Sequence, residues 1–261
     1  MSISNFHKSS FAKLTAWLLI VGLMLPACAE MVNTPEPPVD NESFVDKTAK
    51  VASSFSSSSE LFQSILNDVK SKKDHAKSRE FRIQISDFQK FTSSSNASLR
   101  AKEKASANAR FNRTDLGSTD VDIMMKSVAA KNPLGQEFFY KLMALGEKVV
   151  EENPQVAGMT DEQKMEFVKN YFAADVAKHV AETSINSENP CYLICYEDFV
   201  IESTWASVVL ATALAGCTIT GAFSQTCVIM VAGVYAIQYS VELGYLWSCV
   251  DKCTSAILEQ A

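Results

Sequence analysis

The chain has 261 residues, a net charge of −6 and 47% hydrophobic residues, which is enough apolar material for a sizeable core. The acidic balance argues against general nucleic-acid binding. The sequence has three histidines and shows no paired-histidine metal motif, phosphate-binding glycine loop or GxSxG turn, so we expect no enzyme, no metal and no cofactor.

Residues 1–29 are typical of an export signal. Two lysines precede an apolar stretch, Leu14 to Leu25, that is too short to span a bilayer. The segment that ends at Cys28 resembles the lipobox of bacterial lipoproteins, which makes Cys28 a candidate for lipid attachment. Ala27 and Ala29 fit ordinary secretion equally well. Both cleavage sites predict an exported bacterial protein, which is anchored as a lipoprotein in the first case and freely secreted in the second.

Residues 30–119 are predicted to be mostly flexible, with short helices near 44–76 and 80–91. Serines dominate 53–59, and 92–109 has little apolar content. Between residues 67 and 113, twelve Lys or Arg stand against five acids. Such a basic run is typical of a solvated segment. Alternatively it contacts an acidic partner, either anionic lipid headgroups or the acidic C-terminal segment.

Residues 120–187 are predicted to be an amphipathic helical segment. One helix starts at Gly135, has an apolar face from Phe138 to Val150 and ends near Pro154. A capping-box pattern starts a second helix, whose apolar face is Met165, Val168, Phe172 and Val176, with Thr160 and Gln163 as the box. These faces need a partner, and we expect them to cover the segment that follows. His179 is interpreted as structural.

Six cysteines in the predicted C-terminal domain, residues 188–261, have a palindromic spacing. The steps are 4, 22, 10, 22 and 4 residues, and the numbers of each mirror pair add up to 444. At about 100° per residue, a step of 22 returns to within about 40° of the same helix face. The spacing therefore predicts two antiparallel helices joined by nested disulfides: Cys191–Cys253, Cys195–Cys249 and Cys217–Cys227.

A rival pairing joins Cys191 to Cys195 and Cys249 to Cys253. It would strain an intact helix, because these side chains lie one turn apart on the same helix. The nested order is similar to that of saposin-like domains, which bind lipid or lyse membranes and also have two short cysteine pairs around a central loop. This resemblance rests on spacing over about 65 residues. It implies a helical fold that works at membranes, although saposin-like arms are longer, bent and more charged.

The predicted hairpin has no charged residue from Ser203 to Val241. A helix pair that is apolar on all sides must be covered by protein or by lipid. The helices of 120–187 are either a permanent cap or a temporary one, that is, a prosegment; otherwise the hairpin enters a bilayer. The apolar candidates for a membrane-facing role lie off the cysteine seam: Trp205, Val208, Leu210, Leu214, Ile229, Met230, Val234 and Ile237.

The same mirror rule that pairs the cysteines, numbers adding up to 444, also places Glu202 opposite Glu242. Two facing carboxylates in apolar surroundings raise the apparent pKa of one of them, so we interpret the two as a candidate pH-sensitive acid pair. The alternative is that both side chains turn outward, to water or to a basic residue. Aromatic residues near the base predict either a belt at a membrane interface or ordinary core packing: Tyr192, Tyr196, Phe199, Trp205, Tyr245 and Trp247.

The order of signal, helical middle and cysteine-bearing apolar end resembles secreted antimicrobial toxin precursors of the sporulation-delaying type. Two short motifs upstream of a CxxxC add to that resemblance: Gly135 to Phe139 and Gly146-Glu147. That family differs in having fewer cysteines and a wider spacing within its cysteine pair. The resemblance implies a bacteriocin-like hairpin that is released from a prosegment and permeabilises bilayers. It also implies a dedicated immunity or processing protein as partner, and leaves open whether the hairpin oligomerises on membranes.

The alternative function is a surface or outer-membrane lipoprotein with a non-enzymatic helical domain that binds lipid or protein. Both readings predict an all-α protein. Its N-terminal half is expected to be flexible, followed by a helical segment packed on a C-terminal, disulfide-bonded antiparallel hairpin.

Overall fold

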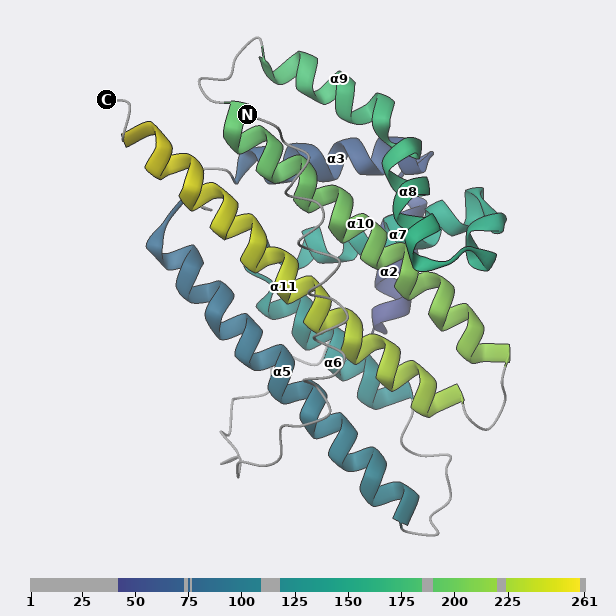
Figure 1. Cartoon of the computed structure of the whole chain (residues 1–261). Helices are drawn as coiled ribbons and strands as arrows, with labels where there is room; N and C mark the ends of the chain where they lie inside the picture. The colour runs from purple at the N-terminus through teal and green to yellow at the C-terminus, as the bar shows by residue number, and fades with distance from the viewer. Residues whose placement is uncertain are drawn as a thin grey trace. The chain divides into compact units, whose positions relative to one another are not determined.

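The computed structural model describes residues 42–72, 75, 77–108, 118–184, 190–219 and 224–258. The chain divides into two units, Met1–Asn41 and Glu42–Ala261, and all described residues lie in the second. Every regular element in this described part is helical, which confirms the predicted all-α class (Figure 1). The expected export signal, with Cys28, lies outside the described residues.

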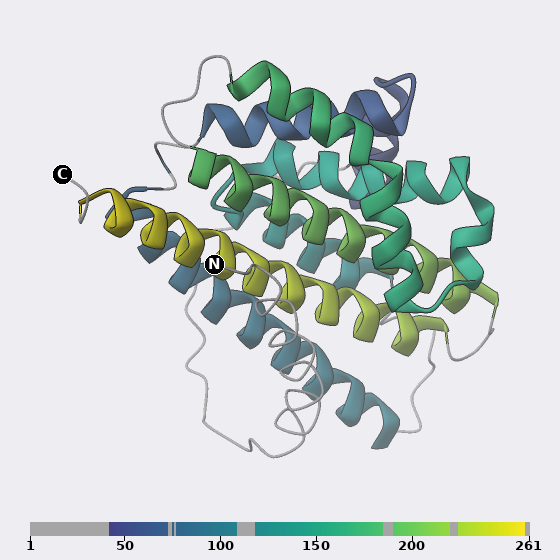
Figure 2. The same ribbon diagram turned by 45° about the horizontal axis from the view of Figure 1, so that its top comes forward.

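The predicted hairpin is present and forms the centre of the second unit. Its arms are α10 (Pro190–Ile219) and α11 (Ser224–Leu258). On its other side α11 packs along α5 (Arg79–Asn108), so three long helices lie side by side (Figures 1 and 2). Two further helices pack against the arms, α7 (Gln136–Glu152) on α10 and α6 (Ser118–Lys131) on α11.

The segment after α7 follows the sequence prediction with one difference. A short 3-10 turn, η2 (Pro154–Gly158), leads into α8 (Asp161–Tyr171), and both hydrogen bonds of the predicted capping box are formed at its start. The predicted second helix is interrupted at Phe172, and α9 (Ala173–Ser184) continues after the turn. Phe172 is fully buried and stacks on Phe62 at 4.1 Å between ring centroids, so the interruption lies at a core contact.

The serine run 53–59 is a junction between two packed helices, α2 (Phe44–Ser53) and α3 (Ser58–Ser71). Ser57 caps α3 by accepting a hydrogen bond from the backbone N–H of Glu60. Ser58 is buried, and its backbone N–H donates to Glu152 of α7 at 2.9 Å. The serines therefore supply helix-end hydrogen bonds, and this part of the predicted flexible region is ordered.

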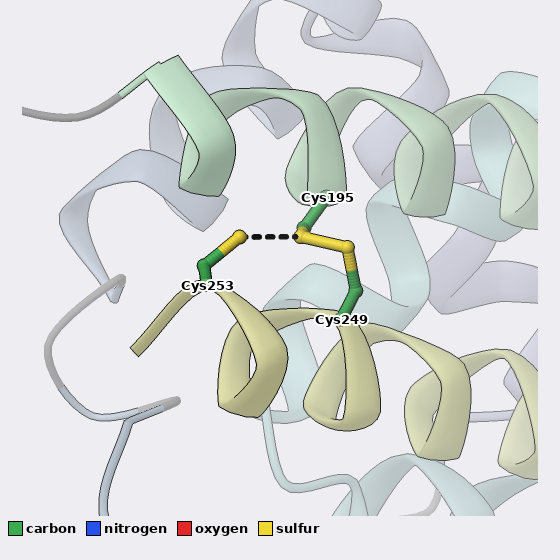
Figure 3. Close-up of side chains that lie close together, drawn as sticks. All are labelled: Cys195, Cys249 and Cys253. Carbon is green, nitrogen blue, oxygen red and sulfur yellow. Dashed lines mark hydrogen bonds between the residues drawn. A yellow bond between two sulfur atoms is a disulfide. The ribbon is translucent and has the colours of Figure 1, made fainter. Parts of the chain in front are cut away.

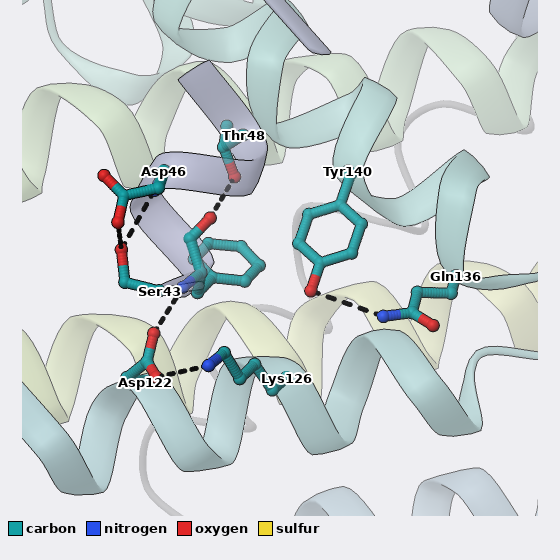
Figure 4. Close-up of polar contacts among 8 residues, drawn as sticks. Ser43, Asp46, Thr48, Asp122, Lys126, Gln136 and Tyr140 are labelled. Carbon is teal, nitrogen blue, oxygen red and sulfur yellow. Dashed lines mark hydrogen bonds and ion pairs between the residues drawn. The ribbon is translucent and has the colours of Figure 1, made fainter. Parts of the chain in front are cut away.

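Helix α2 docks on α6 and α7 through its first turn (Figure 4). Ser43 Oγ accepts a hydrogen bond from the N–H of Asp46, which caps the helix, and the N–H of Phe44 donates to Asp122 of α6. The Phe44 ring lies 5.3 Å from the ring of Tyr140 on α7. The hydrogen bond to Asp122 and the ring contacts of Phe44 with Tyr140 and Phe139 thus hold α2 against α6 and α7.

The predicted short helix near 80–91 is much longer in the structure, because α5 continues to Asn108. Its buried positions keep a helical spacing throughout: Phe81, Ile85, Phe88, Thr92, Asn96 and Leu99. The middle of this buried line is polar, with Thr92 and Asn96 in it. A search for apolar periodicity alone therefore ends the helix too early, and residues 92–108, which were expected to be flexible, are helical.

Helix α7 lies between the hairpin and the N-terminal helices, and it is buried from Phe138 to Gly146. Its one buried charge in that stretch, Lys141, forms an ion pair with Asp68 of α3 at 2.7 Å. Apolar residues from all these helices form one continuous core. Helix α7 approaches α10 closely at Gly146, because a Cβ there would lie 2.5 Å from the backbone of Ser207.

We predict that Gly146→Ala destabilises the fold. The added methyl group must push α7 away from α10, and overpacking of this kind costs about 1–3 kcal/mol. Gly158→Ala is the matched control, because nothing lies within 4 Å of a Cβ at that position. Urea unfolding should show a lower unfolding free energy for the first variant alone. Equal stability of the two variants would contradict this close packing.

Candidate functional site

The disulfide-bonded hairpin is the candidate functional site. Its six cysteines pair as Cys191–Cys253, Cys195–Cys249 and Cys217–Cys227, with Cα–Cα distances of 5.8, 5.7 and 5.6 Å. This confirms the nested pairing and excludes the rival within-helix pairing. Two bonds hold the open ends of the helices, and the third holds the end near the connecting loop.

The two disulfides at the base touch each other, and Figure 3 shows Cys253 of one beside the Cys195–Cys249 bond of the other. Cys195 Sγ lies 3.6 Å from Cys253 Sγ, and these atoms and Cys249 Sγ all lie within 4.8 Å of one another. Since all three sulfurs are in disulfides, none carries a proton, and the contact is a van der Waals one. Metal ions bind the thiolate form of cysteine, so in the oxidised protein this cluster is a double covalent link.

Helix α7 covers the hairpin along α10 with a constant offset. Phe138 stacks on Phe199 at 6.2 Å, and Gly146 meets Ser207, so contacting residues differ by 61 in both pairs. The two helices are therefore parallel and in register.

At the end of α6, the amide oxygen of Asn132 accepts a hydrogen bond from the hydroxyl of Tyr239, which is fully buried, at 3.1 Å.

Helix α5 covers α11 in the opposite direction. The Arg82 guanidinium lies over the Trp247 ring at 4.6 Å, and Gln89 Nε2 donates to the backbone oxygen of Ser240 at 3.1 Å. Further along, the Asn96 side chain rests against the backbone of Gly233. The residue numbers add up to 329 in each pair, so the basic run makes an antiparallel, in-register contact with the hairpin. It does so through an aromatic ring and polar groups.

The helices that pack on the hairpin, which we call the cover, extend over much of the first arm, α10. Cys191–Cys217 is long and apolar enough to cross a bilayer, because an 18-residue window within it has a mean hydropathy of 1.5, and 56% of that window is buried by protein. Trp205 Nε1 donates to the backbone oxygen of Asp161 at the start of α8, at 3.0 Å. A core helix of a globular domain has the same length and composition, so the hydropathy alone does not decide its role.

The eight predicted membrane-facing residues divide between the arms. On α10, Val208 and Leu210 are buried and do not reach the surface, while Trp205 and Leu214 are half-buried against the core, because the covering helices take the place predicted for lipid. On α11, Met230 and Val234 are exposed and Ile237 is half-buried. The side chain of Ile229 lies outside the described part. Of these eight, the described residues that are exposed, Met230 and Val234, both lie on the second arm.

The structure brings Glu202 and Glu242 together. Burial raises the pKa of Glu242 to about 7, and the negative charge of Glu202 acts in the same direction, whereas a hydrogen bond from Gln238 opposes it. Nearby on α10, burial and the neighbouring Asp198 raise the pKa of Glu197 to about 7. The base of the hairpin thus holds carboxyl groups that change charge near neutral pH.

The aromatic residues near the base serve mainly packing. Tyr196 and Phe199 are buried in the core. Tyr192 hydrogen-bonds Thr254 at 2.9 Å and lies under Lys77. Tyr245 is 59% exposed and is the one described member of the group that points outward to this extent. The packing alternative therefore accounts for most of the predicted aromatic belt.

His179 is 3% exposed, as its structural interpretation requires, and burial lowers its pKa. The sequence prediction missed the residues that fit the cover to the hairpin: Gln89, Asn96, Asn132, Gly146 and Gly233. A signal for two of them was present, because a glycine inside a helical pattern often marks a close backbone approach. The polar ones carried no such signal.

Comparison with known proteins adds no relative. The chain matches no known protein family, no curated protein and no solved structure. The resemblances to sporulation-delaying toxins and saposin-like domains therefore stay predictions.

We predict that the stability of this fold falls as the pH rises. A carboxyl group with a pKa near 7 in the folded state and near its ordinary value in the unfolded state keeps its proton only when folded, over the interval between the two. Raising the pH from about 4.5 to 7 should therefore cost up to about 3 kcal/mol through Glu242.

Glu242→Gln should flatten this dependence, and Glu166→Gln, at an exposed position on α8, should leave it unchanged. Urea unfolding at pH 5 and pH 8 measures the difference. Parallel behaviour of Glu242→Gln and the parent chain would exclude Glu242 as the cause.

Proposed function

We propose that this chain is an exported, non-enzymatic protein of the bacteriocin-precursor kind, whose C-terminal hairpin binds and permeabilises bilayers. The observation that supports it best is the placement of the disulfides. Each of the three bonds has both ends between residues 191 and 253. The hairpin is thus closed on itself, and its one covalent connection to its cover is the chain between α9 and α10. One cut between Ser184 and Pro190 would remove that connection and leave only non-covalent contacts.

The apolar composition of the hairpin favours a lipid bilayer as the target of the released part. Its arms are uncharged from Ser203 to Val241, and many of their side chains are buried under protein. Once the cover is lost, the apolar faces need a new apolar environment, which a bilayer offers. The disulfides keep the arms antiparallel throughout. The loop closed by Cys217–Cys227 alone saves about 3 kcal/mol of chain entropy in the chain-entropy account.

The fit of the cover explains how the same chain stays folded before release. Close approach at Gly146 and the buried hydrogen bond from Tyr239 to Asn132 hold the hairpin without a covalent bond. Because Glu242 gains its proton inside this arrangement, a mildly acidic medium strengthens the covered state. Release therefore depends on cleavage, and acidification without cleavage keeps the hairpin covered.

A second candidate is a lipoprotein whose helical domain stays intact and binds lipid or protein. The continuous core shared by the cover and the hairpin favours it. Intact mass separates the candidates. A released fragment of about 70 residues, lighter by six hydrogens, supports the precursor. A full-length diacylated chain supports the lipoprotein.

The direct test replaces residues 185–189 by a specific protease site. We expect cleavage there to cause dye release from liposomes, while the uncut chain causes little. The matched control carries the same site at 111–115, where a cut leaves the hairpin attached to α6 through α9. Leakage that is the same before and after cleavage at 185–189, or absent in both states, would refute the proposal.

A further inference from the structure

One face of α11 stays outside the cover. Met230, Val234 and Tyr245 are 45%, 55% and 59% exposed, and Ile237 and Val241 between them are half-buried. Steps of three and four residues put these five side chains in one line along the helix. We call this line the outer stripe. Its first three members, Met230, Val234 and Ile237, have no charged residue within four positions on α11, because the chain is uncharged up to Val241.

The neighbours of the outer stripe follow from the helix contacts already described. On one side lies α10, whose residues at the level of Met230 to Ile237 are uncharged. On the other side lies α5, in the register set by Gln89 on Ser240 and Asn96 on Gly233. That register puts Arg100 at the level of residue 229, one residue before Met230, and Lys90 at the level of Tyr239, two residues beyond Ile237.

The charges of α5 beside the stripe are basic. Arg82 points to the α11 side, since it lies over Trp247. Eighteen residues make five helical turns, so Arg100 points the same way as Arg82. Arg100 is exposed, and Lys90 is 76% exposed with a 3.4 Å ion pair to the exposed Asp87 that contributes little. The five hairpin acids lie toward the base, away from Met230 and Val234: Glu197, Asp198, Glu202, Glu242 and Asp251.

We propose that the intact chain docks on an anionic lipid bilayer through Met230, Val234 and Ile237, with Lys90 and Arg100 at the headgroup phosphates. An apolar line with cations beside it is the combination that binds an anionic membrane surface, where apolar burial and electrostatic attraction add. This inference rests on the proposed function for its target, but it concerns the covered chain before any release. Docking would place the hairpin against the membrane that it later enters.

The test measures binding to vesicles of equal parts phosphatidylcholine and phosphatidylglycerol, and to vesicles of phosphatidylcholine alone. The chain used starts at residue 30, without the export signal; all described contacts lie within Glu42–Ala261. We expect binding to the anionic vesicles only. Val234→Glu should weaken it about tenfold, because an exposed valine no longer enters the interface. The matched control is Val45→Glu on α2, also exposed, at 65%.

A second pair of variants tests the cations. Lys90→Gln with Arg100→Gln should lose about fivefold in binding for each charge removed. Lys50→Gln with Lys178→Gln, both exposed and on α2 and α9, should bind like the parent. Urea unfolding of each variant checks that the fold is kept. Equal binding of Val234→Glu and Val45→Glu overturns the proposal.

The occupant of the stripe is tested at the same time. If Val234→Glu instead abolishes a dimer of the chain in solution and leaves vesicle binding unchanged, the stripe is an interface between copies and the membrane proposal is wrong. Dye release after cleavage at 185–189 tests the proposed function independently of docking. Docking without leakage removes the lytic proposal alone, and leakage without docking of the uncut chain removes this one alone.

Discussion

The contact between α10 and α11 sets the position of the other helices. Three disulfides fix the direction, spacing and level of the two arms before any weaker contact is counted. Helix α5 then runs antiparallel along α11, and α7 runs parallel along α10, each with a constant register over several turns. Non-covalent packing between apolar helices is tolerant of sliding, whereas a covalent frame is not. The rigid hairpin gives the amphipathic helices around it a fixed template.

The cover is specific because a few positions interrupt its apolar surfaces. Gly146 lets the α7 backbone reach α10, Gly233 receives the Asn96 side chain, and Tyr239 keeps its buried hydroxyl satisfied through Asn132. A buried hydroxyl without a partner is costly, so a helix displaced by one turn would lose more than apolar area. These contacts select one arrangement among many that would bury similar amounts of surface. They also explain how an uncharged hairpin can be held beneath other helices without aggregating.

Much of this structure could be predicted from local signals. Mirror spacing gave the disulfides, the capping box at Thr160 gave the start of α8, and the facing of Glu202 and Glu242 followed from their levels on the arms. The length of α5 did not follow, because Thr92 and Asn96 continue its buried line with polar side chains. Nor did the split of the hairpin faces, since Val208 and Met230 are equally apolar in sequence. Which of them meets water depends on where α5 and α7 pack, and that is a property of the tertiary structure.

The order of the helices along the chain means that the hairpin is synthesised after the helices that cover it. Every helix that packs on α10 and α11 precedes them in sequence. A chain made from its N-terminus therefore contains α2 to α9 first, with their apolar faces not yet covered, and the hairpin last. At the moment the uncharged arms emerge, the surface that receives them is already attached to the same chain, at the high local concentration that a short connection provides. The helices that bury the apolar faces of the hairpin are therefore already made when the hairpin is completed.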